Sequence, residues 1–334
     1  MLPEVRLNGW GYCLPGTAIS NPELAKRLAT TDDLGAETGI AERFFAAADE
    51  GPSGLAALAA GPAMARAGIV ADDLSMLVFA TTTPDVAFPG SACFLQEKLG
   101  APTVGALDLR AQAAGFVASL DMAGAFCGTQ APGAAAAPIL VATAEVFSSS
   151  LDFSPGGQAL ASRLADGAAV VVLSTGGKGP RLLTSRWYTD GTQLEKFWTE
   201  APHSSQLGRR IGLDDLAAGR HYPQSDLPAL RGLAQARLVE VLREVCAETH
   251  TDLGRAARVV IDYVEPQVAH AVAEDLGLSR DRVAVPTASF GHVMAAGLGI
   301  DLARNLDTLA PGERVVLASA GPGFTWGAAV IEAD

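Results

Sequence analysis

The stretch GALDLRAQAAGFVASLDMAGAF, residues 105–126, decides the fold. Its first residues, 105–109, form a strand-like piece, and the small-residue segment after them predicts a helix. Ala and Gly dominate that helical segment, and small side chains let a helix lie close to other backbone. We therefore expect a buried central helix whose first N–H groups, which carry a partial positive charge, face the protein interior.

The same order of elements occurs twice along the chain. A strand-like run at 76–80 precedes the quoted stretch, and the strand PILVATAEV (138–146) follows it. The second half repeats this order in RVVIDYVEP (258–266), VAHAVAEDLGL (268–278), RVAVPTA (282–288), SFGHVMAAGLGIDLARNL (289–306) and ERVVLASAG (313–321). Alternating β and α segments indicate parallel strands joined by crossover helices, and continuous apolar strands indicate sheets covered on both faces.

The repeat predicts an α/β body built from two halves, 1–175 and 176–334, with the active site at their junction. A polar stretch at 187–231 has poor periodicity and interrupts the second half. Such an insertion caps a pocket or binds an acceptor, or it is a plain connecting loop; the sequence leaves both interpretations open.

The charge of the chain excludes some classes of partner. Of the 334 residues, 49% are hydrophobic and 18% charged, which is typical of a compact soluble protein. A formal net charge of −13 repels nucleic acid and anionic membrane surfaces. The same charge disfavours an acidic carrier protein or the phosphates of coenzyme A, unless a local basic patch binds them. Arg209, Arg210 and the stretch 255–258 are weak candidates for such a patch.

The cysteines and the chain start predict a cytoplasmic protein. Four widely separated cysteines, with no metal-ligand spacing, are expected to be reduced thiols: Cys13, Cys93, Cys127 and Cys246. The first residues form no apolar signal segment, and no apolar run reaches the length of a membrane span. We expect neither a metal site nor membrane insertion.

Five segments, in this order, resemble the ketosynthase III (β-ketoacyl-ACP synthase III) branch of the thiolase superfamily. They are ATTTPDVAFPGSACFLQEKLG (80–100), DLRAQAAGF (108–116), LADGAAVVVLS (164–174), SFGHVMAAG (289–297) and GPGFTWGAAV (321–330). The resemblance implies the thiolase fold, a duplicated five-layer αβαβα arrangement with two mixed central sheets, and a homodimer. It also implies an acyl-CoA or an acyl carrier phosphopantetheine as donor substrate, and no covalently bound cofactor.

The resemblance places the nucleophile at position 113, where the family has a cysteine and this chain has Ala113. The family cysteine stands at the start of the buried helix and takes the acyl group from a thioester. A methyl group cannot attack a thioester, so we expect this chain to be inactive as written. Two interpretations compete, a natural loss of the nucleophile and an engineered replacement, and we favour the replacement because the surrounding residues keep the family pattern.

The two bases also depart from the family pattern. Alignment without a gap places Asp262 at the family histidine and His292 at the family asparagine, whereas an anchor on Pro266 would place Gln267 at the histidine. A cysteine at 113, His292 and Asp262 would form a nucleophile, a general base and an orienting acid. Glu265 is the substitute for Asp262, and His270 has the wrong helical phase.

The resemblance assigns other residues to the walls of the site. The Gly-rich turn Gly321–Pro322–Gly323 matches the family's oxyanion turn, but a proline there has no N–H to donate. Phe88 matches a phenylalanine at the family dimer interface, with a core aromatic as the alternative, and Phe290 is expected to line the pocket. Leu34 and Glu37 occupy positions where the family contacts the coenzyme A nucleotide, so the usual adenine clamp is not expected.

These features predict an acyltransferase that moves a short acyl group, malonyl or similar, from a thioester to a hydroxyl of a polyketide or sugar secondary metabolite. The exchanged bases resemble the malonyl transferases of antibiotic biosynthesis, the cervimycin type, more than a fatty-acid initiation enzyme. The alternatives are a starter-unit ketosynthase that forms a carbon–carbon bond and a non-catalytic protein that binds an acyl carrier.

Overall fold

Ten strands form one mixed sheet in the computed structural model, which describes residues 4–129, 137–204 and 210–334. The strand order is β12-β11-β13-β14-β8-β1-β7-β6-β4-β5. Their bounds are β1 Val5–Cys13, β4 Met76–Ala80, β5 Gly105–Leu109, β6 Ile139–Glu145, β7 Gly167–Ser174, β8 Arg181–Thr189, β11 Arg258–Asp262, β12 Val283–Ala284, β13 Arg314–Gly321 and β14 Thr325–Glu332. Five strands of the second half, β12 to β8, are followed by their five counterparts of the first half in reverse order, β1 to β5. The chain is therefore built from two equivalent halves.

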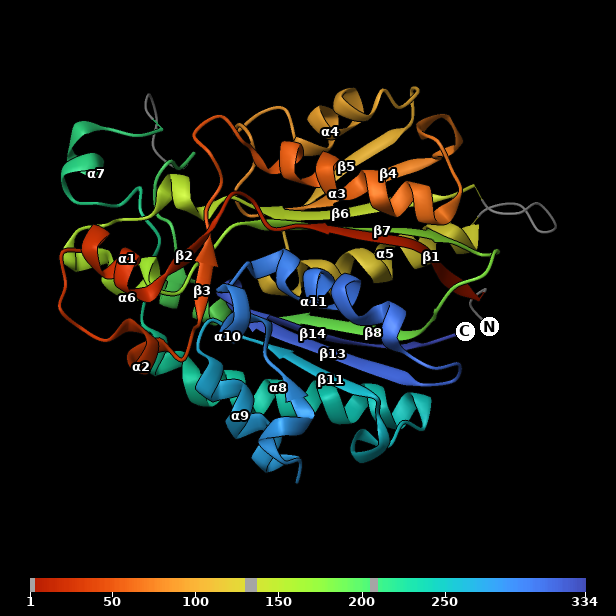
Figure 1. Cartoon of the computed structure of the whole chain (residues 1–334). Coiled ribbons are helices and arrows are strands. Elements are labelled where there is room, and N and C mark those ends of the chain that lie inside the picture. The colour runs from red at the N-terminus through yellow and green to blue at the C-terminus, as the bar shows by residue number, and fades with distance from the viewer. Residues whose placement is uncertain (1–3, 130–136, 205–209) are drawn as a thin grey trace.

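The halves meet where β1 pairs with β8 in antiparallel fashion, Val5 opposite Leu182 and Arg6 opposite Arg181. This short pairing joins the two expected sheets into one continuous sheet. Helices pack on it in layers, as Figure 1 shows: α3 and α4 cover one outer face, α5 and α11 lie between the two halves, and α8 and α9 cover the other outer face. The expected five-layer α/β arrangement is confirmed.

Small residues explain why α5 and α11 fit in the middle layer. The helices are α3 Pro52–Ala67, α4 Ser91–Leu99, α5 Gly115–Thr129, α8 Leu227–Thr249, α9 Pro266–Asp275 and α11 Gly297–Asn305. A Cβ added at Gly115 of α5 would lie 2.9 Å from the Ala295 Cβ, and one added at Gly299 of α11 would lie 2.7 Å from the Ala169 Cβ. Larger side chains at these two positions would push the central helices away from their neighbours.

Shorter elements gather at one end of the sheet (Figure 1). They are β2 Ala18–Ser20, α1 Asn21–Arg27, α2 Leu34–Thr38, β3 Glu42–Phe44, α6 Gln158–Ala161, β9 Phe197–Trp198, α7 Leu213–Ala217, β10 Gln224–Ser225 and α10 Pro286–Phe290. Short 3₁₀ turns precede or join the larger elements: η2 Gln112–Ala114, η5 Gly191–Lys196, η8 Met294–Ala296 and η10 Pro322–Phe324. The stretch 187–231 therefore contains the end of β8, η5, the antiparallel pair β9–β10 with α7 between its strands, and the start of α8, in addition to loops.

Two local predictions need correction. The strand expected at 282–288 is only the two-residue β12, because Pro286 begins α10 with the fixed backbone angle that a first helical turn uses. The helix expected directly after Gly291 begins only at Gly297, because a 3₁₀ turn with Met294 at φ 39° intervenes. The sequence patterns also did not predict β1, β8, α3 or α8 as elements.

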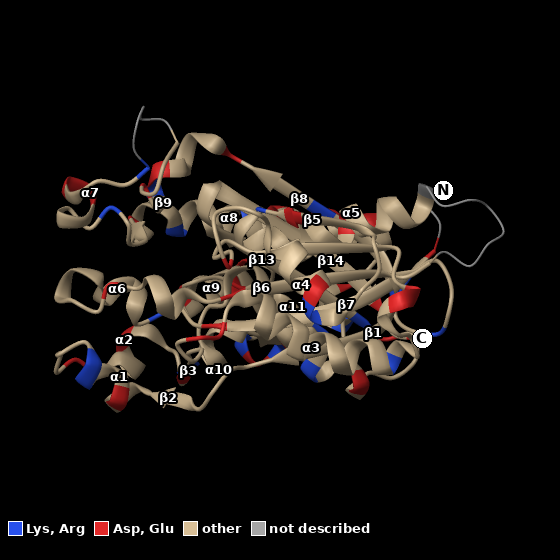
Figure 2. Ribbon diagram, turned by 90° about the horizontal axis from the view of Figure 1, so that it is seen from above, with Lys and Arg blue, Asp and Glu red and all other residues tan. Residues whose placement is uncertain are grey.

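Charged residues of both signs are interspersed over the helices and loops (Figure 2). Of the expected basic candidates, Arg209 lies outside the described residues, and Arg258 makes a two-bond ion pair with Asp301 at 2.7 Å for each contact. The guanidinium of Arg258 is therefore already neutralised. Within the described part of the chain, no helix has the length and apolar character needed to cross a bilayer.

Candidate active site

Ala113 lies in the turn η2, directly before α5, and is fully buried. Gln112 adopts a left-handed backbone conformation with φ 44°, which sets the direction of the turn. The carbonyl of Ala113 accepts a hydrogen bond from the Ser319 hydroxyl at 2.7 Å, so the end of β13 in the other half holds this turn. A side chain at 113 therefore stands at a helix N-terminus, at the junction of the halves, where a thiol would ionise more readily.

The Gly-rich turn lies against Ala113. A Cβ added at Gly321 would lie 2.6 Å from the Ala113 Cβ and 3.4 Å from the Met294 sulfur, so only glycine leaves space here. Gly323 has φ 115°, a conformation that glycine adopts without strain. The structure thus brings Gly321 of the expected oxyanion turn beside position 113.

The structure also brings His292 and Asp262 together. Both side chains are fully buried, and the His292 Nδ1 lies 3.5 Å from the Asp262 Oδ2. Asp262 ends β11, and His292 follows Gly291, whose φ of 82° turns the chain after α10. Backbone bonds from the His292 N–H to the Arg163 carbonyl at 2.8 Å and from the Ala165 N–H to the His292 carbonyl at 3.0 Å fix the segment.

Thr287 connects this pair and is a residue that the sequence analysis missed. Its hydroxyl donates to the Asp262 Oδ1 at 2.5 Å and lies 3.0 Å from the His292 Nδ1. Since the threonine proton is used on the carboxylate, its oxygen is free to accept a hydrogen bond from an Nδ1–H. This arrangement favours the tautomer in which Nδ1 carries the proton and Nε2 has a free lone pair.

The His292 Nε2 is buried and has no hydrogen-bond partner among the described residues. Buried polar atoms are normally hydrogen-bonded, so an unpaired imidazole nitrogen indicates a position kept for a ligand or a reacting group. A neutral imidazole held through Nδ1 and open at Nε2 has the arrangement of a general base.

The alternative residues lie elsewhere. Gln267 is exposed on the first turn of α9, and its amide donates to Glu265 at 3.3 Å. Glu265 is fully buried, but Arg231 binds both of its carboxylate oxygens, at 2.7 and 2.8 Å. Burial lowers the pKa of His270, a half-buried residue of α9. None of these three is a described partner of His292, so Asp262 is the carboxylate that the geometry supports.

The two phenylalanines occupy different environments. Phe88 is 88% exposed in the single chain, so it is not a core aromatic. Phe290 is buried, but its ring packs with Ala165 and Val293 in a cluster separate from the one that contains Ala113. The structure therefore does not place Phe290 beside Ala113, because the Phe290 side chain belongs to this second cluster.

Two further predictions concern Leu34 and Glu37, at the positions where the family contacts the coenzyme A nucleotide, and the insertion at 187–231. Leu34 is buried in α2, and Glu37 lies 3.6 Å from the Arg163 guanidinium. The insertion contacts the Gly-rich turn directly, because Asp190 and Phe324 exchange two backbone hydrogen bonds at 2.7 and 2.9 Å. This contact connects the start of the 187–231 stretch to the wall of the site.

Glu145, at the end of β6, is a second residue that the sequence analysis missed. Its fully buried carboxylate accepts hydrogen bonds from the backbone N–H and hydroxyl groups of Thr82 and Thr83, at 2.8–3.1 Å. It also accepts a 3.4 Å bond from the Ala295 N–H, in the turn that follows His292. Burial raises the pKa of Glu145 to about 7, although these hydrogen bonds oppose the shift.

Family models match both halves of this site. The model of 3-oxoacyl-[acyl-carrier-protein] synthase III matches residues 107–191, and the model of its C-terminal part matches residues 246–333. A β-ketoacyl-[acyl-carrier-protein] synthase III from Rhizorhabdus wittichii is 33% identical over 328 residues, 97% of each chain. The chain belongs to the β-ketoacyl-ACP synthase III family. The family resemblance is thus confirmed.

Solved structures extend the similarity to the fold of this family. The crystal structure of 3-oxoacyl-(acyl carrier protein) synthase III from Pseudomonas aeruginosa is 29% identical, covers 98% of both chains and superposes with a TM-score of 0.85. The corresponding enzyme from Aquifex aeolicus is 27% identical, covers 98% of this chain and 99% of its own, and has a TM-score of 0.84. The β-ketoacyl-ACP synthase III architecture therefore extends over nearly the whole chain.

Proposed function

We propose that the form with cysteine at position 113 is an acyltransferase that moves a short acyl group, malonyl or similar, from a thioester to a hydroxyl and forms an ester. The pairing of His292 with Asp262, with Nε2 left open, carries this proposal. A base oriented by a carboxylate suits deprotonation of an incoming hydroxyl. The donor would be an acyl-CoA or an acyl carrier protein, since relatives in this family are named as carrier-protein synthases.

Each residue has a defined part in the proposed reaction. His292 takes the proton of the thiol at 113, the thiolate attacks the thioester carbonyl, the carbon–sulfur bond to the donor breaks, and the same proton passes from His292 to the leaving donor thiolate. His292 then takes the proton of the acceptor hydroxyl through Nε2, while Asp262 and Thr287 hold Nδ1 and stabilise the imidazolium. The acceptor oxygen attacks the acyl-enzyme, the ester departs, and the proton returns from His292 to the sulfur. N–H groups at the start of α5 would stabilise the negative charge on the carbonyl oxygen.

The test is the intact mass of the Ala113→Cys form after incubation with malonyl-CoA or acetyl-CoA, with the alanine form as control. We expect an acyl adduct on the cysteine form alone. An Ala295→Cys variant is a matched second control, because this residue is in the equivalent turn of the other half. Failure of every thioester to form an adduct would contradict the proposal and favour a non-catalytic protein that binds an acyl carrier.

A starter-unit ketosynthase is the second candidate, favoured by the names of the relatives. It differs in its product, because condensation forms a carbon–carbon bond and releases carbon dioxide from a malonyl unit. Release of carbon dioxide by the adduct-forming variant with malonyl carrier protein would support the ketosynthase. Formation of an ester with a hydroxyl acceptor and retention of the carboxyl carbon would support acyl transfer. Both candidate functions include a homodimer with Phe88 at its interface.

A further inference from the structure

Tyr263 carries a buried hydroxyl that the proposed reaction does not use. The residue directly follows Asp262 and is 1% exposed. Its hydroxyl oxygen has no hydrogen-bond partner among the described residues. An unpaired buried hydroxyl destabilises the folded chain, because the same hydroxyl is hydrogen-bonded to water in the unfolded chain. An unpaired phenol beside a reaction centre therefore calls for a partner that arrives with the substrate.

The carboxylate whose charge acts on Tyr263 does not supply that partner. Glu265, two residues along the chain, is bound through both oxygens by Arg231 and also accepts a hydrogen bond from Gln267. Burial, together with the charge of Glu265, raises the pKa of Tyr263 far above its ordinary value. The phenol consequently keeps its proton at neutral pH and acts as a hydrogen-bond donor.

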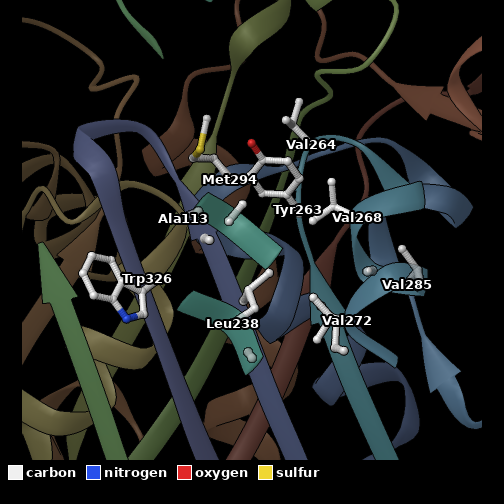
Figure 3. Packing of buried hydrophobic residues seen from close by; sticks show 14 of the residues in the cluster. Ala113, Leu238, Tyr263, Val264, Val268, Val272, Val285, Met294 and Trp326 are labelled. Carbon is white, nitrogen blue, oxygen red and sulfur yellow. The ribbon is translucent and has the colours of Figure 1, made fainter. Parts of the chain in front are cut away.

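Tyr263 belongs to the same apolar cluster as Ala113 and Met294. Figure 3 shows the hydroxyl end of Tyr263 directed toward the Met294 side chain, away from Val272. The Met294 sulfur and the Ala113 Cβ both border Gly321, within 3.4 Å of the position of an added Cβ. Ala113, Gly321 and Met294 thus lie together at the nucleophile position, and the free hydroxyl of Tyr263 points toward this group.

We infer that the Tyr263 hydroxyl binds a second oxygen of the acyl group, beyond its thioester carbonyl. Val264 and Met294, the labelled side chains toward which the hydroxyl end points in Figure 3, are apolar, so a plain alkyl group would leave the phenol unpaired. A keto, hydroxyl or carboxyl oxygen would accept its hydrogen bond. Tyr263 is thereby a specificity-determining residue that selects oxygen-bearing acyl groups. This inference rests on the proposed function only in that the occupant of the site is an acyl thioester.

Binding to the chain as it stands tests the inference, because Ala113 cannot consume the ligand. Butyryl-CoA and acetoacetyl-CoA have the same chain length and differ by one oxygen at the third carbon. Calorimetric titration is expected to show that acetoacetyl-CoA binds about tenfold more tightly than butyryl-CoA. This ratio is the effect expected from one hydrogen bond to a buried donor. The Tyr263→Phe variant should bind both ligands within about twofold of each other. Malonyl-CoA, as a third ligand, shows whether a carboxylate oxygen is preferred to a keto oxygen.

The matched control is Tyr188→Phe, which removes a phenol that donates to Glu244 at 2.6 Å on the surface; the ligand preference should persist in this variant. The melting temperature gives a second readout. Tyr263→Phe should raise it or leave it unchanged, because an unpaired hydroxyl is lost. A lower melting temperature together with an unchanged ligand preference would show a purely structural role.

The inference would be overturned if the parent chain and Tyr263→Phe had the same preference between acetoacetyl-CoA and butyryl-CoA, or if neither ligand bound. Failure of the proposed function is a separate result, because it is measured as absence of an adduct on the Ala113→Cys form. Tyr263-dependent binding without an adduct would leave the ligand selectivity standing and remove only the transfer reaction.

Discussion

The turns Gln112–Gly115 and Met294–Gly297 have the same kind of backbone conformation and occupy equivalent places in the two halves of the molecule. Each begins with a residue in the left-handed region, Gln112 at φ 44° and Met294 at φ 39°, and each ends at a glycine that starts a central helix. Each is also held by the opposite half. Ser319 of β13 binds the Ala113 carbonyl, and Glu145 of β6 binds the Ala295 N–H.

The two turns differ in what precedes and supports them. His292 stands two residues before Met294, with Asp262 and Thr287 behind it, whereas Arg110 stands two residues before Gln112. The first turn therefore presents the nucleophile position, and the second presents the base. The duplicated fold supplies two equivalent positions, and the chemistry is divided between them. Variants that alter one turn and spare the other test this division.

The largest effect is expected from His292→Gln in the Ala113→Cys background. Loss of the general base should lower the rate of acyl transfer to the acceptor by about 10²–10⁴-fold. The measurement is ester formation followed over time by mass spectrometry.

The matched control for this variant is His270→Gln, on α9, which should keep the parent rate. A His292→Gln variant that transfers at the parent rate would show that the base lies elsewhere, whatever happens to the adduct.

The Glu145→Gln variant tests how Glu145 supports the second turn, Met294–Gly297. The measured quantity is the pH dependence of the free energy of unfolding. Since the folded-state pKa of about 7 exceeds the unfolded value of 4.5, the folded chain binds the proton more tightly. Stability should therefore fall as pH rises from about 4.5 to about 7, and stay level above that. Glu145→Gln should remove this loss, about 3 kcal/mol in the free energy of unfolding.

Denaturant unfolding at pH 5, 6, 7 and 8 measures this prediction. Glu240→Gln, an exposed carboxylate on α8 whose partner is Arg237, should keep the pH dependence of the parent chain. Parallel curves for the parent and Glu145→Gln would contradict the proposed shift.

Much of the fold could be predicted from periodicity, because strands buried on both faces and small-residue helices leave clear patterns. The predicted runs 76–80 and 105–109 are β4 and β5 with the same bounds. β8 was missed because most residues on both of its faces are only partly buried and apolar and polar residues are mixed, as in RLLTSRWYT. The predicted strand at 282–288 was wrong since Pro286 favours a helix start, which a local apolar pattern does not reveal.

The site was less predictable, because its parts come together only through the fold. Family spacing indicated His292 and Asp262, and the structure places their side chains 3.5 Å apart. Thr287 gave no signal, since one hydroxyl within an apolar segment has no pattern. Glu145 ends a strand as many carboxylates do, and its link to the second turn spans 150 residues. The separate packing of Phe290 depends in part on Ala165 and Ala169, which lie far from it in sequence.

Gly297→Ala is expected to have a moderate effect on the second turn. The added Cβ would lie 2.2 Å from the Asp262 Oδ2, so the carboxylate must move away from His292. We expect about 1–3 kcal/mol of destabilisation, and a lower transfer rate in the Ala113→Cys background. Gly61→Ala is the matched control, because a Cβ there meets nothing within 4 Å in the helix α3; it should stabilise the chain slightly.

The smallest effect is expected from Thr287→Val in the Ala113→Cys background. Valine has nearly the same shape but no hydroxyl, so Asp262 loses its 2.5 Å bond and the His292 Nδ1 loses an acceptor, while Asp262 remains close enough to orient the imidazole. The transfer rate should fall about tenfold, with adduct formation less affected, because orientation is weakened and the base is kept. Thr143→Val is the matched control, since that fully buried hydroxyl donates to the Ala169 carbonyl at 3.3 Å and takes no part in the proposed reaction. Equal rates for the two variants would mean that Asp262 alone sets the tautomer of His292.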